Sequence, residues 1–449
     1  MSRAPDRPPY DEAYDDSGEP RPQYAELLAA IEDPGALRDE ALRRLEARGV
    51  TFGDGEVARF DPVPRVLTEA EWSELEAGIG QRMRALEAFT RDVYGEGRVF
   101  DSGVLAREDV EASPHYEPAM RGARVRRWVP FAGFDVIRCE DGRFRAIEDQ
   151  LRMPSGIAYA VVWRETVRDL LGVAPPQSDT SAVFGELALA LHDAAPRDAG
   201  EPRVVILSEG PAAAAWWEHE RLARELCAPV VSLADLEHRD GRLVAWVDGR
   251  PRAVDVVYLR TGEDRFTGED ARPTAIGEAL LEPAAAGTVA VVNAPGSGVA
   301  DDKLVAAHVD ELVRLYLGEE PLLPSVPSRA VGPDDDLDGL VVKPRGEMGG
   351  EDVVIWRDAD AETRDRVRAR IAAEPGGWIG QELVQLSVHP TVVDGGLEPR
   401  HVDLRPYALL TDDGVRVLPA AASRVALVRG SLIVNSGQGG GAKDTWIPA

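Results

Sequence analysis

Apolar residues recur at intervals of three and four in two stretches of the first hundred positions. One stretch spans residues 23–49 and the other spans residues 68–95, and charged residues fill most of the positions between the apolar ones. This spacing predicts two amphipathic helical segments. Thr68 begins the second stretch and Glu71 follows three residues later, which is the pattern of a capping box. We therefore expect residues 1–120 to form a mainly helical region whose role is packing rather than catalysis.

The pattern changes to that of strands further along the chain. Residue types that favour strands dominate residues 121–156, and short apolar runs at residues 202–210 and 253–260 flank a helical pattern over residues 216–231. Alternation of strand and helix predicts an α/β unit with a mostly parallel sheet. Linkers are predicted where Pro, Gly, Ser and Asp crowd together, at residues 175–180 and 331–338.

A strand, a loop, a helix and another strand are predicted towards the C-terminus. Residues 340–342 are apolar, and a second strand follows a glycine-rich loop. Asp360 is a candidate N-cap for a helix, because its carboxylate can accept from the first free backbone N–H groups. The strand predicted at residues 378–386 carries polar Gln381 and Glu382 among apolar residues. Such an interruption suits contact with the base and ribose of a nucleotide.

Composition restricts the class of protein. The 449 residues are 44% hydrophobic and 29% charged, which is enough for two or three packed domains. A net charge of -28 opposes attraction to nucleic acid and to anionic lipid, so we expect neither as a partner. Cys139 and Cys227 cannot form a disulfide framework, and no Cys/His cluster offers a zinc site. Because the chain shows neither the apolar core of a signal peptide nor a long apolar run, we expect a cytoplasmic protein without a membrane span.

Lysine is nearly absent, since the chain has three lysines and 48 arginines. Lys303 stands in GSGVADDK, Lys343 in LVVKPRGEMGG and Lys443 in SGQGGGAKDTW. An ammonium is compact and flexible where a guanidinium is planar, so lysines kept at these places indicate polyphosphate binding. The alternative is that three lysines are what a biased composition leaves by chance.

A β-hairpin is predicted over residues 134–150. If Asp141 and Gly142 form a two-residue turn, counting outwards sets Asp135 directly opposite Glu148. The same face then carries two further pairs, Ile137 opposite Ala146 and Cys139 opposite Phe144.

Asp135 and Glu148 would then be neighbouring carboxylates on an apolar face, which is destabilising unless a positive charge lies between them. A divalent cation supplies that charge, and Gln150 on the same side adds a carbonyl oxygen. Hard oxygen ligands suit Mg²⁺. We therefore predict a Mg²⁺ site formed by these three residues. The alternatives are that the acids are merely solvated, or that the register slips by one residue.

The loop after Lys343 is a weaker phosphate signal. Gly346, Gly349 and Gly350 would let backbone amides approach phosphates. The Walker A spacing is absent, and no helix opens directly after the glycines. A plain hairpin loop explains these glycines equally well.

Several stretches together resemble the circularly permuted ATP-grasp family. They are NAPGSGVADDK, LEPRHVDLRPYALL, SRVALVRGSLIVNSGQGGGAKDTW and the N-terminal YDEAYDDSGEPRPQY, so the resemblance spans nearly the whole chain. An ordinary ATP-grasp enzyme has its carboxylate hairpin last, whereas here the hairpin comes first. The resemblance implies a mixed fold of α+β and α/β type, in which a helical N-terminal region precedes three parts: the metal-binding hairpin at residues 121–175, a Rossmann-like α/β domain at residues 200–298, and the ATP-binding lobe at residues 299–449.

The resemblance also assigns roles to residues already singled out. Members of the family hold metal with two acids, contact the nucleotide with two lysines and a hinge acid, and use a third lysine. The matching positions here are Asp135 and Glu148 for the metal, Lys303 and Lys343 for the nucleotide, Glu382 for the hinge, and Lys443 for the third lysine.

Two arginines are candidates for catalysis. Arg405 in DLR and Arg424 in SRVAL lie on predicted strands, and a guanidinium can clamp two oxygens of a carboxylate or of a transferring phosphoryl group. The alternative, pairing with a neighbour such as Asp403, is equally open for each.

The segment NSGQGGGAK, residues 435–443, is too glycine-rich for a core element. We expect a loop that closes over the phosphates and delivers Lys443, with Asn435 or Gln438 orienting a metal or phosphate oxygen. The alternative is a disordered tail.

The reaction class follows from the resemblance. ATP-grasp enzymes typically phosphorylate a carboxylate with ATP, and an amine then displaces phosphate from the acyl phosphate. We therefore expect an ATP- and Mg²⁺-dependent ligase that joins a small-molecule or peptide carboxylate to an amine; the alternative is a nucleotide-binding scaffold without catalytic activity. Two departures bear on this: Gln150 replaces the Asn of the family's EDNLRTPSG text, and Arg260 is what remains of an arginine pair.

Overall fold

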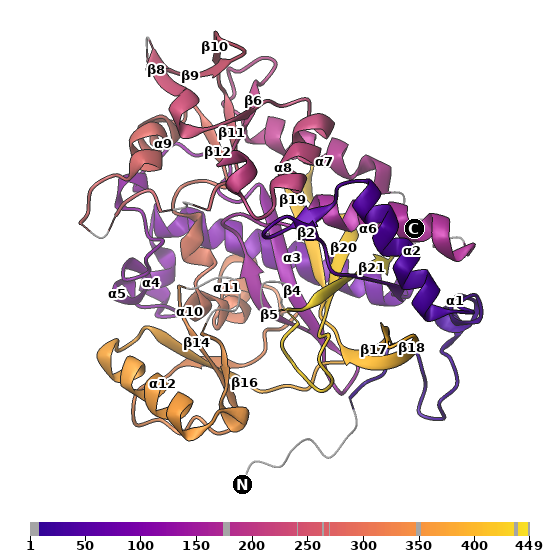
Figure 1. Cartoon of the computed structure of the whole chain (residues 1–449). Coiled ribbons are helices and arrows are strands. Elements are labelled where there is room, and N and C mark those ends of the chain that lie inside the picture. The colour runs from indigo at the N-terminus through magenta and orange to yellow at the C-terminus, as the bar shows by residue number, and fades with distance from the viewer. Residues whose placement is uncertain are drawn as a thin grey trace.

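The computed structural model describes residues 9–173, 180–239, 241–262, 265–268, 270–346, 352–434 and 439–447. Figure 1 shows a large sheet at the centre, an α/β unit above it, and a smaller lobe with helix α12 below it. No helix in these ranges is both long enough and apolar enough to cross a membrane.

The central sheet has six strands in the order β3-β21-β20-β19-β4-β5. Neighbouring strands are antiparallel except β3 and β21, which are parallel. Strands from residues 60–150 and from residues 405–446 therefore share one sheet. Their bounds are β3 Phe60–Val66, β4 Phe131–Arg138, β5 Phe144–Gln150, β19 Arg405–Thr411, β20 Gly414–Val425 and β21 Gly441–Trp446.

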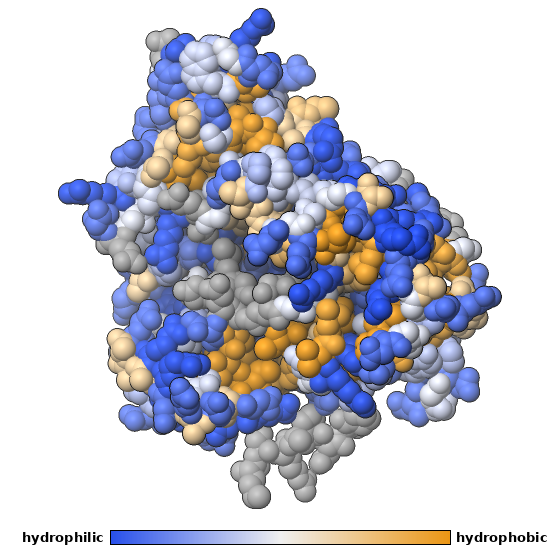
Figure 2. All heavy atoms as spheres, viewed as in Figure 1, coloured by the Kyte–Doolittle hydropathy of each residue, from blue (hydrophilic) through white to orange (hydrophobic). Residues whose placement is uncertain are grey.

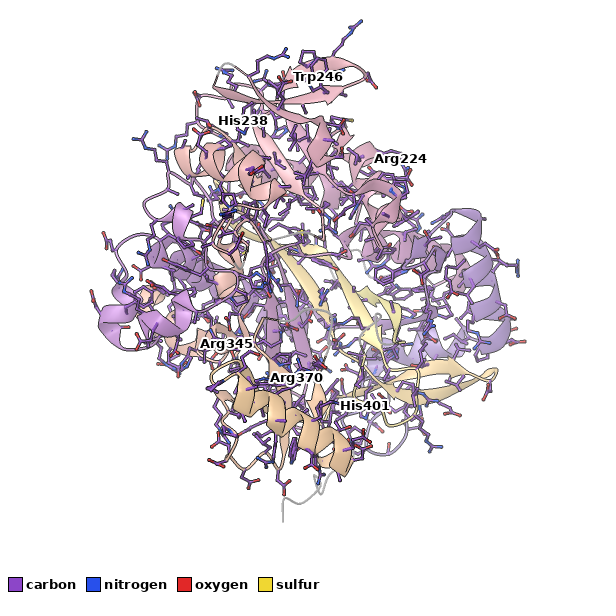
Figure 3. All side chains as sticks on the ribbon, turned by 60° about the vertical axis from the view of Figure 1, so that its left-hand side comes forward. Arg224, His238, Trp246, Arg345, Arg370 and His401 are labelled. Atoms are coloured by element: carbon purple, nitrogen blue, oxygen red, sulfur yellow. The ribbon has the colours of Figure 1, made fainter. Side chains whose placement is uncertain are left out.

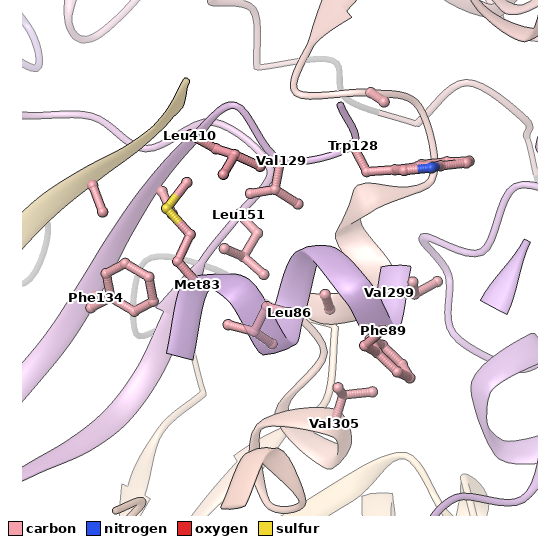
Figure 4. Packing of buried hydrophobic residues seen from close by; sticks show 14 of the residues in the cluster. Met83, Leu86, Phe89, Trp128, Val129, Phe134, Leu151, Val299, Val305 and Leu410 are labelled. Carbon is pink, nitrogen blue, oxygen red and sulfur yellow. The ribbon is translucent and has the colours of Figure 1, made fainter. Parts of the chain in front are cut away.

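Alternation along the strands gives this sheet two buried faces. Ala408 and Leu410 pack in one core with helix α3 (Glu69–Val93), whereas Tyr407 and Leu409 pack in another with helix α6 (Ile157–Leu171). Figure 4 shows the α3 side, with Met83, Leu86 and Phe89 on the helix and Phe134, Leu410 and Val305 among the side chains of the same core. Helices α2 (Pro34–Ala47) and α7 (Val183–Ala194) pack in the same core as α6.

Helix α3 begins as its sequence predicts. Thr68 accepts from the Glu71 N–H, and the Glu71 carboxylate accepts from the Thr68 N–H at 2.8 Å, so the capping box is confirmed. The earlier helical stretch divides into α1 (Ala25–Ala29) and α2, because Asp33 caps a new helix start at Pro34. The remaining short helices around this core are α4 Arg98–Ser102, α5 Arg107–Glu111, α10 Lys303–Ala306 and α11 Val309–Leu317.

The α/β unit has the parallel sheet that its sequence predicts. Its order is β12-β11-β6-β7 with all pairs parallel, and a three-stranded antiparallel sheet β10-β9-β8 adjoins it. The strands are β6 Val204–Leu207, β7 Val230–Val231, β8 Leu236–Arg239, β9 Arg242–Val247, β10 Arg250–Ala253, β11 Val256–Leu259 and β12 Ala290–Val292, and the helices are α8 Trp216–Glu225 and α9 Ala275–Ala286.

The lower lobe is a second antiparallel sheet, β13-β16-β14-β15, with α12 (Ala361–Ala373). The predicted N-cap is confirmed, because the Asp360 carboxylate accepts from the Thr363 N–H at 2.8 Å. The predicted linker at residues 331–338 joins β13 to β14, whereas residues 175–179 of the other predicted linker lie outside the described ranges. The strands are β13 Ser328–Ala330, β14 Leu340–Pro344, β15 Val354–Ile355 and β16 Trp378–Glu382, and two small hairpins complete the fold, β1 Thr51–Phe52 with β2 Glu56–Val57 and β17 Val388–Val393 with β18 Gly396–His401.

Candidate functional site

The hairpin of β4 and β5 sets Asp135 opposite Glu148, as predicted, although by a different route. The turn has three residues rather than two, because Cys139 pairs with Arg143. A register shift after Asp135 compensates for the extra turn residue. The further pairs predicted for this hairpin are therefore wrong: Val136 lies opposite Ala146, Ile137 opposite Arg145 and Arg138 opposite Phe144.

A cavity of about 290 Å³, which we call the interlobe cavity, lies between the central sheet and the lower lobe. Figure 2 shows hydrophobic side chains gathered on the surface between these two parts. Charges of both signs line the cavity in equal number, which is a local departure from the net charge of -28. They are Asp135, Glu148, Glu382 and Asp403 with Lys303, Lys343, Arg405 and Arg424.

Two arginines hold Asp135. The Arg405 Nε and Nη2 groups donate to its two carboxylate oxygens at 2.6 and 2.7 Å, and Arg424 Nη2 donates at 2.8 Å. Burial acts to raise the pKa of Asp135, but the two guanidinium charges outweigh burial and hold the pKa well below its usual range. Arg424 also pairs with Asp403, whose pKa is raised by burial. The alternative of pairing with Asp403 therefore holds for Arg424, which binds both Asp403 and Asp135. Arg405 pairs with Asp135 instead.

The structure brings Lys303 and Lys343 to the same cavity. Lys303 Nζ lies 3.3 Å from a Glu148 oxygen, and Lys343 Nζ donates to the Gln381 amide oxygen at 2.7 Å. Burial lowers the pKa of Lys343 to about 8; Glu148 opposes this shift and the nearby Lys303 charge adds to it. Gln381 is fixed in turn by donation to the Ile147 carbonyl at 3.2 Å.

The proposed metal ligands line the interlobe cavity together. Gln150 makes no side-chain hydrogen bond with any described residue, so its amide oxygen is available as a ligand. No group of three His, Cys, Asp or Glu side chains within the described ranges could hold a metal ion. A site here therefore depends on Gln150 and on oxygens of a bound phosphate. This donor set fits Mg²⁺, which commonly takes one or two carboxylates and completes its shell with phosphate and water.

The structure does not bring Lys443 to this cavity. Lys443 lies in strand β21, so the expectation of a mobile loop at this position is wrong. Its neighbour Ala442 lies opposite Arg424, which turns the Lys443 side chain to the other face of the sheet. There it is fully buried, pairs with Asp61 and donates to the Pro390 carbonyl at 3.1 Å. Burial lowers the pKa of Lys443.

The other predicted nucleotide contacts are divided. Glu382 is exposed at the end of β16 and lines the cavity. Gly346 lies against Pro114, where a Cβ would approach the ring Cγ to 2.8 Å. Three further predicted contacts, together with Gln438, lie outside the described residues: Gly349, Gly350 and Asn435.

One ion pair joins the lower lobe to the rest of the site. Arg345 follows β14 (Figure 3) and binds both carboxylate oxygens of Asp302 at 3.0 and 2.9 Å. Asp302 caps helix α10, whose first residue is Lys303. The position of Lys303 therefore depends on the residue two places after Lys343.

Sequence reasoning missed the residues that hold the walls of the site in place through contacts outside the interlobe cavity. Asp149 faces away from the cavity and takes a two-pronged contact from Arg82 of α3, at 2.6 and 2.9 Å. Glu218 of α8 accepts from the Ser155 hydroxyl and the Gly156 N–H, and Arg260 donates to the same carboxylate at 2.8 Å. Strict alternation of β5 could have predicted the direction of Asp149, but no local signal points to Glu218.

A comparison with family models identifies the family. The sequence model described as circularly permuted ATP-grasp type 2 matches residues 64–426. A Frankia alni protein named "Putative glutamate--cysteine ligase 2-3" is 43% identical, and the match covers 98% of this chain and 54% of that protein. A protein of Synechocystis, named as uncharacterised, is 37% identical, with 98% of this chain and 96% of that protein covered. The chain thus spans about half the length of the Frankia relative.

A solved structure supports the fold. The chain superposes on a glutathione synthetase-like effector from Globodera pallida, in its apo form, with a TM-score of 0.63. The alignment covers 93% of this chain and 99% of that one, at 11% identity. A likeness at this identity concerns the arrangement of the elements alone.

Proposed function

Because the chain belongs to the circularly permuted ATP-grasp type 2 family, we propose that it is an ATP-dependent carboxylate–amine ligase. One observation carries the proposal: Lys303, Lys343, Arg405 and Arg424 reach a single cavity from four separate segments of the chain. Four cations placed together repel one another, and the four neighbouring carboxylates neutralise their charge without exceeding it. Such an arrangement suits a site whose ligand carries many negative charges.

The proposed reaction has two displacements. A substrate carboxylate oxygen attacks the γ-phosphorus of ATP, the bond from that phosphorus to the β–γ bridging oxygen breaks, and ADP leaves. An amine nitrogen then attacks the acyl carbon, the carbon–oxygen bond to phosphate breaks, and phosphate leaves. The nitrogen loses a proton to solvent, and an amide or peptide bond remains.

The side chains act by position and charge. Lys343 and Lys303 balance the charge that shifts onto the phosphate oxygens during transfer. Arg405 and Arg424 stand beside Asp135, where their guanidinium groups can orient the substrate carboxylate. Mg²⁺ bound by Asp135, Glu148 and Gln150 would neutralise phosphate charge.

The names of two Frankia relatives, the Frankia alni protein and a Frankia casuarinae protein named "Putative glutamate--cysteine ligase 2-2" that is also 43% identical, support this class of chemistry. A glutamate–cysteine ligase joins a carboxylate to an amine, and those proteins match 98% of this chain. We therefore infer small-molecule or peptide carboxylates and amines as substrates. Since the chain spans 54% of each of those relatives, activities of their remaining parts are not carried over.

The test is an end-product assay with the full chain, MgATP and pooled carboxylates and amines. We expect ADP and phosphate to appear together, and only when both a carboxylate and an amine are present. AMP and pyrophosphate in their place would rule out an acyl phosphate.

Two variants and a matched control make the test specific. Lys343→Ala and Glu148→Gln should abolish turnover, because they remove a phosphate contact and a metal ligand. Glu186→Gln makes the same chemical change at a surface ion pair with Arg416 and should leave turnover unchanged. ATP that binds to the native chain but is never consumed with any substrate pool would favour the scaffold alternative.

A further inference from the structure

A second cavity adjoins the first on the α6 face of the central sheet. It has a volume of about 460 Å³ and shares Ser155, Arg405 and Arg424 with the interlobe cavity. We call it the aromatic cavity. The two arginines therefore stand at the junction between a space suited to ATP and a separate space that the nucleotide need not fill.

Aromatic side chains form the walls of this second cavity. Tyr159 and Trp163 are four residues apart on α6, so they lie on one face of the helix, with ring centroids 5.9 Å apart. Tyr407 lines the opposite side from β19. At the entrance the ring of Phe52 lies nearly perpendicular to that of Tyr159, with centroids 6.0 Å apart, and Phe52 stays 38% exposed, which is unusual for a residue of its size. Figure 2 shows hydrophobic surface beside β2 at this place.

The polar groups at the inner end are poised for an anion. Among the described residues, neither Arg405 Nη1 nor Arg424 Nη1 has a hydrogen-bond partner, although the other guanidinium nitrogens bind Asp135 and Asp403. An approaching carboxylate would satisfy donors that the chain itself leaves unused.

The start of helix α6 is not a competing anion site. Glu218 already accepts from the Gly156 and Ala158 N–H groups, at 2.9 and 3.0 Å. Gly156 has φ +113°, and a Cβ there would collide with the Tyr407 hydroxyl. The N–H groups at the start of α6 are thus already occupied, and Arg405 and Arg424 supply the positive charge where the two cavities meet. The segment of residues 52–59 adds Asp54, Glu56 and Arg59 to the lining of the aromatic cavity.

We propose that the aromatic cavity binds the carboxylate substrate, and that this substrate carries an aromatic or large apolar group next to its carboxylate. The carboxylate lies on Arg405 and Arg424, facing the nucleotide, and the apolar group lies between Phe52, Tyr159 and Trp163. This inference rests on the proposed ligase function and goes beyond it. It departs from glutamate, whose polar side chain would gain nothing from such walls.

The test measures binding of small ligands to the full chain by calorimetry. The ligands are chosen to separate the contribution of the carboxylate from that of the aromatic ring. We expect 3-phenylpropionate to bind at least about tenfold more tightly than acetate, which lacks the ring, and than 3-phenylpropan-1-ol, which lacks the charge. Phe52→Ser should weaken 3-phenylpropionate binding by about three- to tenfold and leave ATP affinity unchanged. Trp246 on β9 is equally exposed at 38% and lies in the α/β unit (Figure 3), so Trp246→Ser is the matched control and should change neither.

The outcomes separate this inference from the proposed function. Glutamate or acetate binding as tightly as 3-phenylpropionate, or a Phe52→Ser variant that binds as the native chain does, would overturn the aromatic substrate. ADP release with glutamate but with no aromatic acid would overturn it while leaving the ligase intact. Phe52-dependent binding of 3-phenylpropionate without ADP release from any carboxylate and amine would support the cavity and contradict the ligase.

Discussion

Lys343 should make ATP binding depend on pH in the mildly alkaline range. Burial lowers its pKa from 10.5 to about 8, although Glu148 lies nearby, so the ammonium loses its proton close to physiological pH. The protonated form attracts phosphate oxygens and the neutral form does not. A bound polyphosphate would favour the protonated form, so ATP should raise the pKa of Lys343. Above about pH 8, ATP binding should therefore be accompanied by the uptake of a proton.

The size of the effect follows from the fraction of protonated lysine. With a pKa of about 8, that fraction falls about 25-fold between about pH 7.5 and about pH 9.5. If only the protonated form binds, the Kd for ATP should rise by about the same factor. Besides Glu148, the charged groups that act on Lys343 are Lys303, Asp135 and Arg424. Asp135 and Arg424 stay ionised over this pH range, because the pKa of Asp135 is lowered and that of Arg424 is raised.

The assay is equilibrium binding of a non-hydrolysable ATP analogue at constant ionic strength and constant free Mg²⁺. Lys343→Arg keeps its charge at every pH tested, and Lys343→Met carries none, so both variants should show flat profiles at different affinities. A native profile that is flat as well would refute the assigned pKa. The same slope in native and Lys343→Met chains would show that another group titrates.

Three further predictions concern stability and can be checked by urea unfolding. Lys443→Met should lower the free energy of unfolding by about 3–5 kcal/mol, because it leaves Asp61 buried without its cation. Adding Asp61→Leu should recover much of this loss. A folded Lys443→Met chain should bind ATP normally, and a loss of ATP affinity would show that Lys443 does belong to the nucleotide site. Gly156→Ala should cost about 1–3 kcal/mol, whereas Gly185→Ala on the open surface of α7 should stabilise by about 0.5–1 kcal/mol; equal effects would contradict the strained turn. Thr68→Ala should cost about 1 kcal/mol through the lost cap, and no change would show that packing alone holds the helix start.

Features with a local cause could be predicted from the sequence. The capping box at Thr68 and the N-cap at Asp360 depend on residues within one turn, and the parallel sheet follows from the alternation of strand and helix. Asp135 faced Glu148 as expected only because a longer turn and a register shift offset each other. No turn or pairing signal in the hairpin sequence marks that shift.

Features that depend on distant segments could not be predicted. The rarity of lysine gave Lys443 the same weight as Lys303 and Lys343, but the pairing of β21 with β20 decides which face its side chain takes. Glu218 lies more than sixty positions from Ser155, in an ordinary amphipathic helix, and only the folded chain shows that it holds the cavity floor. In both cases the information lies in tertiary contacts rather than in a motif.

The strand order of the central sheet has a consequence for synthesis. β3 and β4 are made early, yet β21, β20 and β19 from residues 405–446 lie between them. The ribosome therefore releases β3, β4 and β5 long before the three strands that lie between β3 and β4. Until those residues emerge, β3 lacks its partner β21 and β4 lacks its partner β19, so each strand has an unpaired backbone edge and exposed apolar side chains. We therefore expect the nascent chain to bind a chaperone that shields exposed strands.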